Sequence, residues 1–161
     1  MLYLDTPADR LSEALFRYGR ALIRVYDLTL HSRSRAAYTF YEDLNDLILQ
    51  MTGEEQIRRD HLLPDIPNAE RYPVDYRLQG KSGCQVFLYG IPNRDKARLT
   101  TIILSYFRRS HLDFESILVF SDQAEIPRMD LARLSDVGGD MVSSLASRED
   151  LRRKMRRRIA A

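Results

Sequence analysis

Several residue types are scarce in this chain, and each scarcity argues against a class of protein or site. Cys84 is the single cysteine among 161 residues, so no intrachain disulfide can form and we expect a reducing, cytoplasmic setting. The three histidines, His31, His61 and His111, are scattered and show no zinc-ligand spacing. No run reaches the ~20 apolar residues of a membrane span. The opening MLYLDTPADR has early acids, so we expect no signal peptide.

The composition that remains is that of an ordinary globular chain with an uneven charge distribution. Hydrophobic residues make up 44% and charged residues 30%, and the length predicts a single domain, residues 1–161. A domain of this size buries roughly 70% of its unfolded surface. Residues 148–161 hold seven basic residues and two acids, whereas the rest of the chain is slightly acidic, for a net charge of +2. The end of the chain therefore differs electrostatically from its body.

Two stretches of the N-terminal third have apolar residues at helical spacing. Residues 8–26 predict a helix to about Tyr18, and residues 21–30 are left open between helix and strand because β-branched and aromatic residues are frequent there. Ser34 to Gly53 predicts a second helix. Residues 54–71 contain two prolines and no lasting period, so they predict a short helical turn and a connecting loop.

The stretch from Tyr72 to Phe120 predicts the centre of the fold. Residues 72–78 alternate as a strand, Gly80–Gly83 forms a hairpin turn, and residues 84–91 form a second strand. A helix follows over residues 94–109, and residues 115–120 form a strand parallel to its neighbour. Short helices are predicted after Pro127 and around residues 141–145. The predicted fold class is α/β (or α+β): a small mixed sheet of three or more strands with helices packed on it.

The order of these elements resembles the core of the PD-(D/E)xK nucleases. Pro73-Val74-Asp75 resembles the first part of the motif, and Gln85-Val86-Phe87 falls at the second part. The resemblance implies a magnesium ion held by Asp75 and Gln85, with Gln85 as a neutral ligand and Phe87 in place of the lysine.

Other residues could complete such a site. Lys81 in the turn or Arg98 on the following helix could replace the lysine, and Glu42 could add a helix-borne acid. The alternative is that Asp75 is a solvated strand residue and Gln85 an outward polar position.

A second resemblance involves several segments spread along the chain. The segments FYEDL, YPVDYRL, VFLYGIP, KARLTTIIL, VFSDQ and DLARL are similar to small bacterial and phage families of unknown function. An incomplete acid and lysine set implies a relative of the nucleases that has lost catalysis and kept binding.

The basic C-terminal helix is the second candidate site. Its cations are Arg148, Arg152, Arg153, Lys154, Arg156, Arg157 and Arg158. They could neutralise nucleic-acid phosphates or dock on an acidic protein surface. A third alternative is a solubilising helix folded back onto the body through Leu151, Met155 and Ile159.

The sequence leads to a function hypothesis with two alternatives. The leading hypothesis is a non-catalytic bacterial or mobile-element protein that binds a protein or nucleic acid, as a regulator or inhibitor of a nucleic-acid-directed system, without a cofactor. One alternative is a magnesium-dependent nuclease using Asp75, Gln85, Lys81 and Glu42. The other is a structural subunit of a protein complex.

Overall fold

The first helix is much longer than the sequence predicted. The computed structural model describes residues 11–80 and 83–159, and contacts divide the chain into two compact units, residues 1–38 and 39–161. Helix α1 (Leu11–Thr52) is continuous, so residues 21–30 are helical and the two predicted helices are one. The Thr29 hydroxyl donates to the Val25 carbonyl at 2.8 Å, which keeps this polar group satisfied within the helix. The sequence leaves residues 21–30 open between helix and strand because of their β-branched and aromatic residues, and the structure shows that the helix continues through them.

The second unit is built on a five-stranded mixed sheet in the order β1-β2-β3-β4-β5. Its strands are β1 (Ile57–His61), β2 (Val74–Gln79), β3 (Gln85–Ile91), β4 (Phe114–Phe120) and β5 (Asp140–Val142). The first three strands are antiparallel, whereas β4 pairs parallel with β3 and β5 parallel with β4. The predicted α/β class and the parallel pairing after the helix are confirmed. Strand β1 lies in the predicted loop, and β5 lies where a short helix was predicted.

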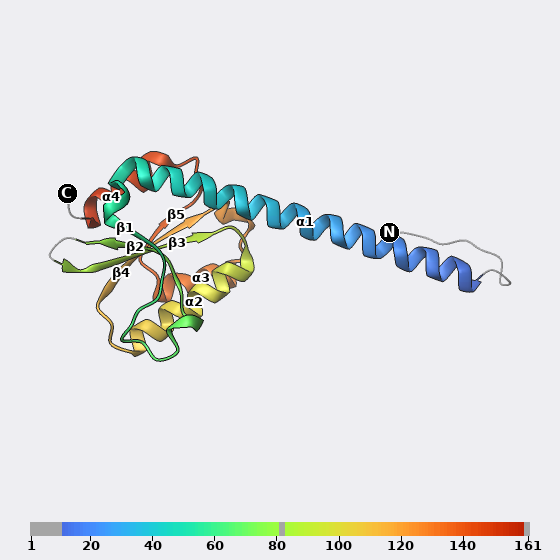
Figure 1. Cartoon of the computed structure of the whole chain (residues 1–161), viewed down its shortest axis with the longest axis horizontal. Coiled ribbons are helices and arrows are strands. Elements are labelled where there is room, and N and C mark those ends of the chain that lie inside the picture. The colour runs from blue at the N-terminus through green and yellow to red at the C-terminus, as the bar shows by residue number, and fades with distance from the viewer. Residues whose placement is uncertain (1–10, 81–82, 160–161) are drawn as a thin grey trace. The chain divides into compact units, whose positions relative to one another are not determined.

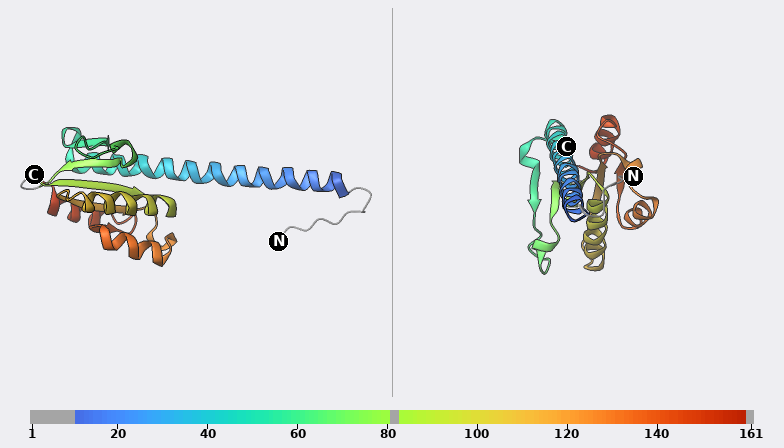
Figure 2. Two further views of the ribbon diagram at one scale, coloured as in Figure 1. Left: turned by 90° about the horizontal axis from the view of Figure 1, so that it is seen from below. Right: turned by 90° about the vertical axis from the view of Figure 1, so that its right-hand side faces the viewer.

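Helices cover both faces of this sheet (Figures 1 and 2). Helices α2 (Arg94–Arg109) and α3 (Arg128–Val137) pack on one face with an apolar cluster that includes Phe87, Tyr89 and Phe107. The last part of α1 and helix α4 (Arg148–Arg158) pack on the other face. Strand β4 contributes to both clusters, so it is apolar almost throughout. Among the described residues, short 3₁₀ turns connect elements at Glu54–Gln56, Ala69–Arg71 and Gln123–Glu125.

Gly90 on β3 lets α1 approach the sheet closely. A Cβ at this position would lie 2.7 Å from Cε1 of Tyr41 and 2.9 Å from Cε1 of Phe40. Any side chain would therefore push the helix outward. Because Gly90 has no side chain, the Tyr41 ring reaches β3, and its hydroxyl lies close to the Gly90 carbonyl and the Asp75 carboxylate. Within the part of the chain that the structure describes, no helix is both long and apolar enough to span a membrane.

Candidate functional site

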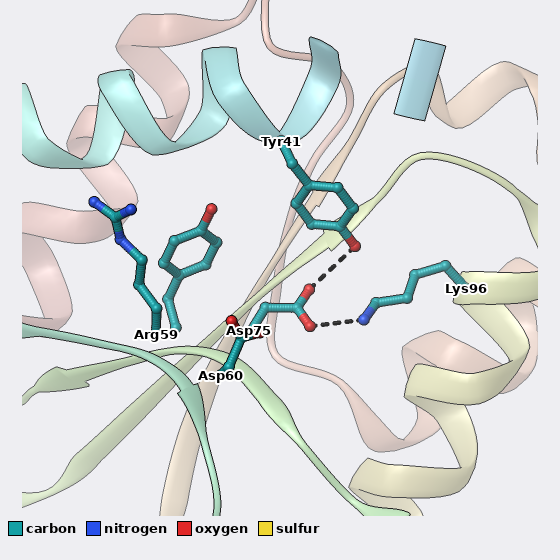
Figure 3. A pocket seen from close by; sticks show the side chains of 6 residues that line it. Tyr41, Arg59, Asp60, Asp75 and Lys96 are labelled. Carbon is teal, nitrogen blue, oxygen red and sulfur yellow. Dashed lines mark hydrogen bonds and ion pairs between the residues drawn. The ribbon is translucent and has the colours of Figure 1, made fainter. Parts of the chain in front are cut away.

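The candidate site centres on Asp75, the second residue of β2 (Figure 3). The Lys96 ammonium donates to Oδ1 of Asp75 at 2.6 Å, and the Gly90 N–H donates to Oδ2 at 3.0 Å. The Tyr41 hydroxyl lies 3.3 Å from the same Oδ2. The side chains of Asp75 and Lys96 are only 11% and 17% exposed. Three elements of the second unit, α1, β3 and α2, thus supply donors to one carboxylate.

Local geometry explains why Lys96 reaches Asp75. Pro92 follows β3, and the Asn93 side chain caps α2 by accepting the Lys96 N–H at 3.0 Å. Because β2 and β3 are antiparallel, the end of β3 lies beside the beginning of β2. The first turn of α2 is therefore placed next to Asp75.

Tyr41 is held between the strand and the carboxylate. Its hydroxyl lies 3.0 Å from the Gly90 carbonyl and 3.3 Å from Asp75 Oδ2, so one proton serves two acceptors. Burial, followed by the negative charge of Asp75, raises the pKa of Tyr41 well above its usual range. The same two causes raise the pKa of Tyr76 to about 12. Both phenols are therefore neutral hydrogen-bond donors at neutral pH.

Burial is the dominant influence on the Asp75 carboxyl. It raises the pKa of Asp75 above the ordinary value, although the Lys96 charge and hydrogen bond, the Gly90 N–H and the Tyr41 hydroxyl all lower it. An ionised carboxylate has about four lone-pair positions, and three are directed at donors of this chain. The site is consequently an internal ion pair in which most of the acceptor positions of the carboxylate are used by groups of the chain itself.

A pocket of about 310 Å³ opens onto this pair. Its walls also include Arg59 and Asp60 of β1 and the Tyr76 ring. The strand register pairs Arg59 with Tyr76 and His61 with Val74, which leaves Asp60 opposite Asp75 without a ladder pair. Asp60 has a φ of 45°, in the left-handed region that aspartate tolerates better than most residues. Two acids and two bases line the pocket, so its formal charge is balanced.

The other predicted site residues lie elsewhere. Gln85 pairs with Gln79 at the far end of the hairpin, and its Oε1 accepts from Arg77 Nε at 3.1 Å. Asp75 and Gln85 each stand at the start of a strand, and antiparallel strands start at opposite ends, so the pair predicted from the sequence is not brought together. Glu42 is exposed on α1 and outside the pocket. Lys81 lies outside the described residues.

Arg98 contacts a different acid, Asp130 on α3. Arg94, Arg98 and Arg133 approach the Asp130 carboxylate at 2.7, 3.1 and 3.5 Å. The Asp130 side chain is 2% exposed, and the Arg94 hydrogen bond is the main cause of its lowered pKa. Residues two apart on a helix point about 200° apart, so Lys96 and Arg98 serve different partners. The arginine cluster joins α2 to α3.

The basic helix α4 is docked on the sheet. Leu151, Met155 and Ile159 are buried in the core, as the folded-back alternative predicted. Arg157 and Arg158 contact the Asp140 carboxylate at 2.6 and 2.5 Å. Hydrogen bonds from Arg158 and Arg157 lower the pKa of Asp140 despite burial, the largest single influence, which acts to raise it.

The remaining cations of α4 are partly engaged within the same unit. Lys154 bonds Asp150 at 2.6 Å and also the Met141 carbonyl, and Arg158 reaches Glu115 at 2.6 Å. Arg152 and Arg153 pair with acids of their own helix, Glu149 and Asp150. Arg148 and Arg156 are exposed. Most of the positive charge of α4 is therefore paired with acids and helps to hold the helix on the sheet. The exposed Arg148 and Arg156 remain accessible to a binding partner.

The described residues contain no cluster of metal ligands, and the comparisons with known proteins give no function for the site. Across residues 11–80 and 83–159, no three side chains of the His, Cys, Asp and Glu types form a metal-binding group. Comparison with protein-family models gave no match, and comparison with curated proteins and with solved structures gave no significant match.

Sequence reasoning missed Lys96, Arg59 and Asp60. A signal for Lys96 was present, because Pro92 and Asn93 place the first turn of the following helix at the Asp75 end of the sheet. For Arg59 and Asp60 no such signal exists. Their strand carries a single buried residue, Ile57, and does not alternate.

Proposed function

We propose that this chain is a non-catalytic protein that acts by binding a macromolecular partner, as a regulator or inhibitor of a nucleic-acid-directed system. The observation that carries the proposal is the Lys96 ammonium, 2.6 Å from Oδ1 of Asp75. In a PD-(D/E)xK-like core, the acid at this strand position would serve as a metal ligand. Here a positive charge of the chain itself neutralises that acid, and a divalent cation would have to displace the lysine against charge repulsion.

A binding role is supported by the surface next to this pair. Strand β1 forms one edge of the sheet, and Arg58, Arg59 and Asp60 are exposed along it. An open edge offers unpaired backbone donors and acceptors, and charged side chains on it select partners and discourage indiscriminate pairing. The balanced charges of the pocket favour a partner with both acidic and basic groups, which is typical of a protein surface. The single cysteine fits a cytoplasmic setting for this role.

A magnesium-dependent nuclease is the second candidate, and one observation favours it. Lys96 comes from α2 instead of β3, yet it lies beside Asp75 in an open pocket that also contains Asp60. In that alternative, Asp60 and Asp75 would bind the metal and Lys96 would steady the attacking water. The lysine would have moved from the strand to the helix, and Asp60 would take the place that the sequence assigned to Gln85.

A plasmid-nicking assay with Mg²⁺ and Mn²⁺ separates the two candidates. The proposal predicts no metal-dependent cleavage by the wild-type protein. Cleavage that is lost in Asp75→Ala and in Lys96→Met, but kept in the exposed control Glu42→Ala, would establish the nuclease instead. Thermal unfolding followed by circular dichroism would show that each variant is folded.

Charge substitutions on α4 test whether the partner is a nucleic acid. Removing the helix would also remove the buried Leu151 and Met155 and expose the core that they cover, so replacement of Arg148, Arg153 and Arg156 by glutamine is the cleaner change. A nucleic-acid partner predicts affinity that falls with salt, and a shallower salt dependence in the variant. Absence of affinity in the wild type would assign the partner to the protein class.

A further inference from the structure

Residues 11–30 expose an unusual amount of apolar surface. Large apolar side chains in this part of α1 are 42–70% exposed, namely Leu11, Leu15, Phe16, Leu22, Ile23, Val25, Tyr26, Leu28 and Leu30. Within residues 11–38 of the first unit they all stand on one helix, and a single helix cannot bury its own face. Contiguous apolar surface of this kind marks an interaction site.

The spacing of these residues is that of a helix that packs along another helix. Positions 11, 15, 18, 22 and 25 follow one another at alternating intervals of four and three, and residues 29 and 32 continue the series with threonine and serine. Alternation of four and three averages 3.5 residues, which keeps a seam on one side of the helix over several turns. Surface helices that face a single globular core do not need so strict a repeat.

Charged residues occupy the opposite side of the helix at the same spacing. They are Glu13, Arg17, Arg20, Arg24 and Asp27, and the polar His31 continues the series. Glu13 and Arg17 form an ion pair at 3.1 Å along this side. The seam is flanked by small residues, Ala14, Gly19 and Ala21, which allow two helix backbones to approach closely.

The exposed area is sufficient for a stable contact. With about 150–200 Å² for a fully exposed large side chain, nine side chains that are about half exposed present on the order of 800 Å². A standard protein interface buries about 800 Å² on each partner. Phe16, Ile23 and Leu30 recur every seven residues at the side of the seam and widen the apolar face beyond the seam itself.

We propose that residues 11–30 pack against the same segment of a second copy of this chain, forming an intermolecular helical bundle. A second copy fits because it brings the same 3.5-residue seam and the same small flanking residues. An anionic lipid surface fits less well, because Glu13 and Asp27 lie within the polar stripe and offset part of its positive charge. The inference goes beyond the proposed function and does not depend on the Asp75 pair.

The test is the mass of the full-length protein in solution, measured by light scattering and sedimentation over a wide range of concentration. Wild-type protein is expected at twice the monomer mass or more. The double variant Leu15→Glu with Leu22→Glu places charges on the seam and is expected to be monomeric. The control, Arg17→Gln with Arg24→Gln, changes the opposite side and is expected to keep the wild-type mass.

Thermal unfolding shows whether a change in mass comes from the seam or from loss of folded structure. Both pairs of substitutions lie in the first unit, so the thermal unfolding of the sheet, followed by near-ultraviolet circular dichroism at low protein concentration, should be the same in both variants as in the wild type. A wild-type protein that is monomeric at every concentration would overturn the proposal. So would a seam variant that keeps the wild-type mass, or a monomer that sediments with vesicles of anionic phospholipid.

Discussion

Large apolar residues of α1 are buried in the second unit and exposed in the first. Leu44 and Ile48 of α1 belong to the second unit and are completely buried, whereas Leu28 of the same helix belongs to the first unit and is 70% exposed. Both stretches have apolar residues at helical spacing. Apolar periodicity therefore indicates a helix with one face to bury. The periodicity alone does not show whether the surface that covers this face belongs to the same chain.

Several acids of the second unit also have partners within that unit. Asp75, Asp130 and Asp140 of the second unit are each held by cationic side chains of that unit. The second unit thus satisfies its core and its partly buried charges internally, and the first unit leaves apolar side chains to be covered.

The largest difference is expected between two identical substitutions on α1. Leu44→Ala removes a fully buried side chain and should lower the free energy of unfolding by about 2–5 kcal/mol. Leu28→Ala, at an exposed position, should change the unfolding of the sheet by less than about 0.5 kcal/mol. Urea denaturation followed by near-ultraviolet circular dichroism at low protein concentration measures both. Equal effects would mean that the two stretches of helix are not distinguished by burial.

Two glycines allow a second matched comparison. Gly90→Ala puts a Cβ within 2.7 Å of the Tyr41 ring and should destabilise the second unit by about 1–3 kcal/mol. Gly19→Ala meets no atom within 4 Å and should stabilise α1 by about 0.5–1 kcal/mol, because alanine is the better helix former. Thermal and urea unfolding would measure the two changes. A neutral Gly90→Ala would show that the close approach of α1 to β3 is not required.

Acid should weaken the second unit through Asp130. Its folded-state pKa lies below the ordinary 3.8, so its stabilising contribution is present above the ordinary pKa and is lost as the pH falls through the folded value. Asp130→Asn should therefore lower the melting temperature at neutral pH and flatten its decline below about pH 4. Asp136→Asn, an exposed acid on the same helix, is the control. A variant profile parallel to that of the wild type would contradict this role.

The smallest expected effect is a shift in one titration. Lys96 lowers the pKa of Asp75 against the larger effect of burial, so Lys96→Met should raise the pKa of Asp75 further above its ordinary value. The ¹³C shift of the Asp75 carboxyl as a function of pH measures the change directly. Arg59→Met lines the same pocket and should have less effect. An unchanged pKa in Lys96→Met would mean that the ion pair does not persist in solution.

Much of the centre of the fold could be predicted because its signals are local. Helix α2 was expected at residues 94–109 and spans Arg94–Arg109, with Asn93 as its N-cap. Strand β4 was expected from its nearly continuous apolar run. Strands β1 and β5 were missed because β1 has one buried residue in five and β5 has only three residues. These two short segments become strands because they pair with β2 and β4, which lie elsewhere in the sequence.

The site was predicted in part for a similar reason. Asp75 could be recognised as an acid on a strand, but the partners assigned to it from the nuclease motif were not those at its own end of the hairpin. Gln85 was chosen by analogy with a motif, whereas the antiparallel register brings Gly90 to Asp75. Arg98 was chosen by its position on the helix, whereas Lys96, two residues earlier, faces the carboxylate. Direction around a helix and register between strands are tertiary properties.

The central claim is that Asp75 is neutralised by Lys96 and does not bind a divalent metal ion. Titration of the ¹⁵N-labelled wild-type protein with Mn²⁺ tests it most directly, because a bound paramagnetic ion broadens the amide signals around it. The account predicts no selective broadening at Gly90, whose N–H donates to the Asp75 carboxylate. Selective loss of the Gly90 and Asp75 signals at low Mn²⁺ concentration, reversed by Mg²⁺, would contradict it.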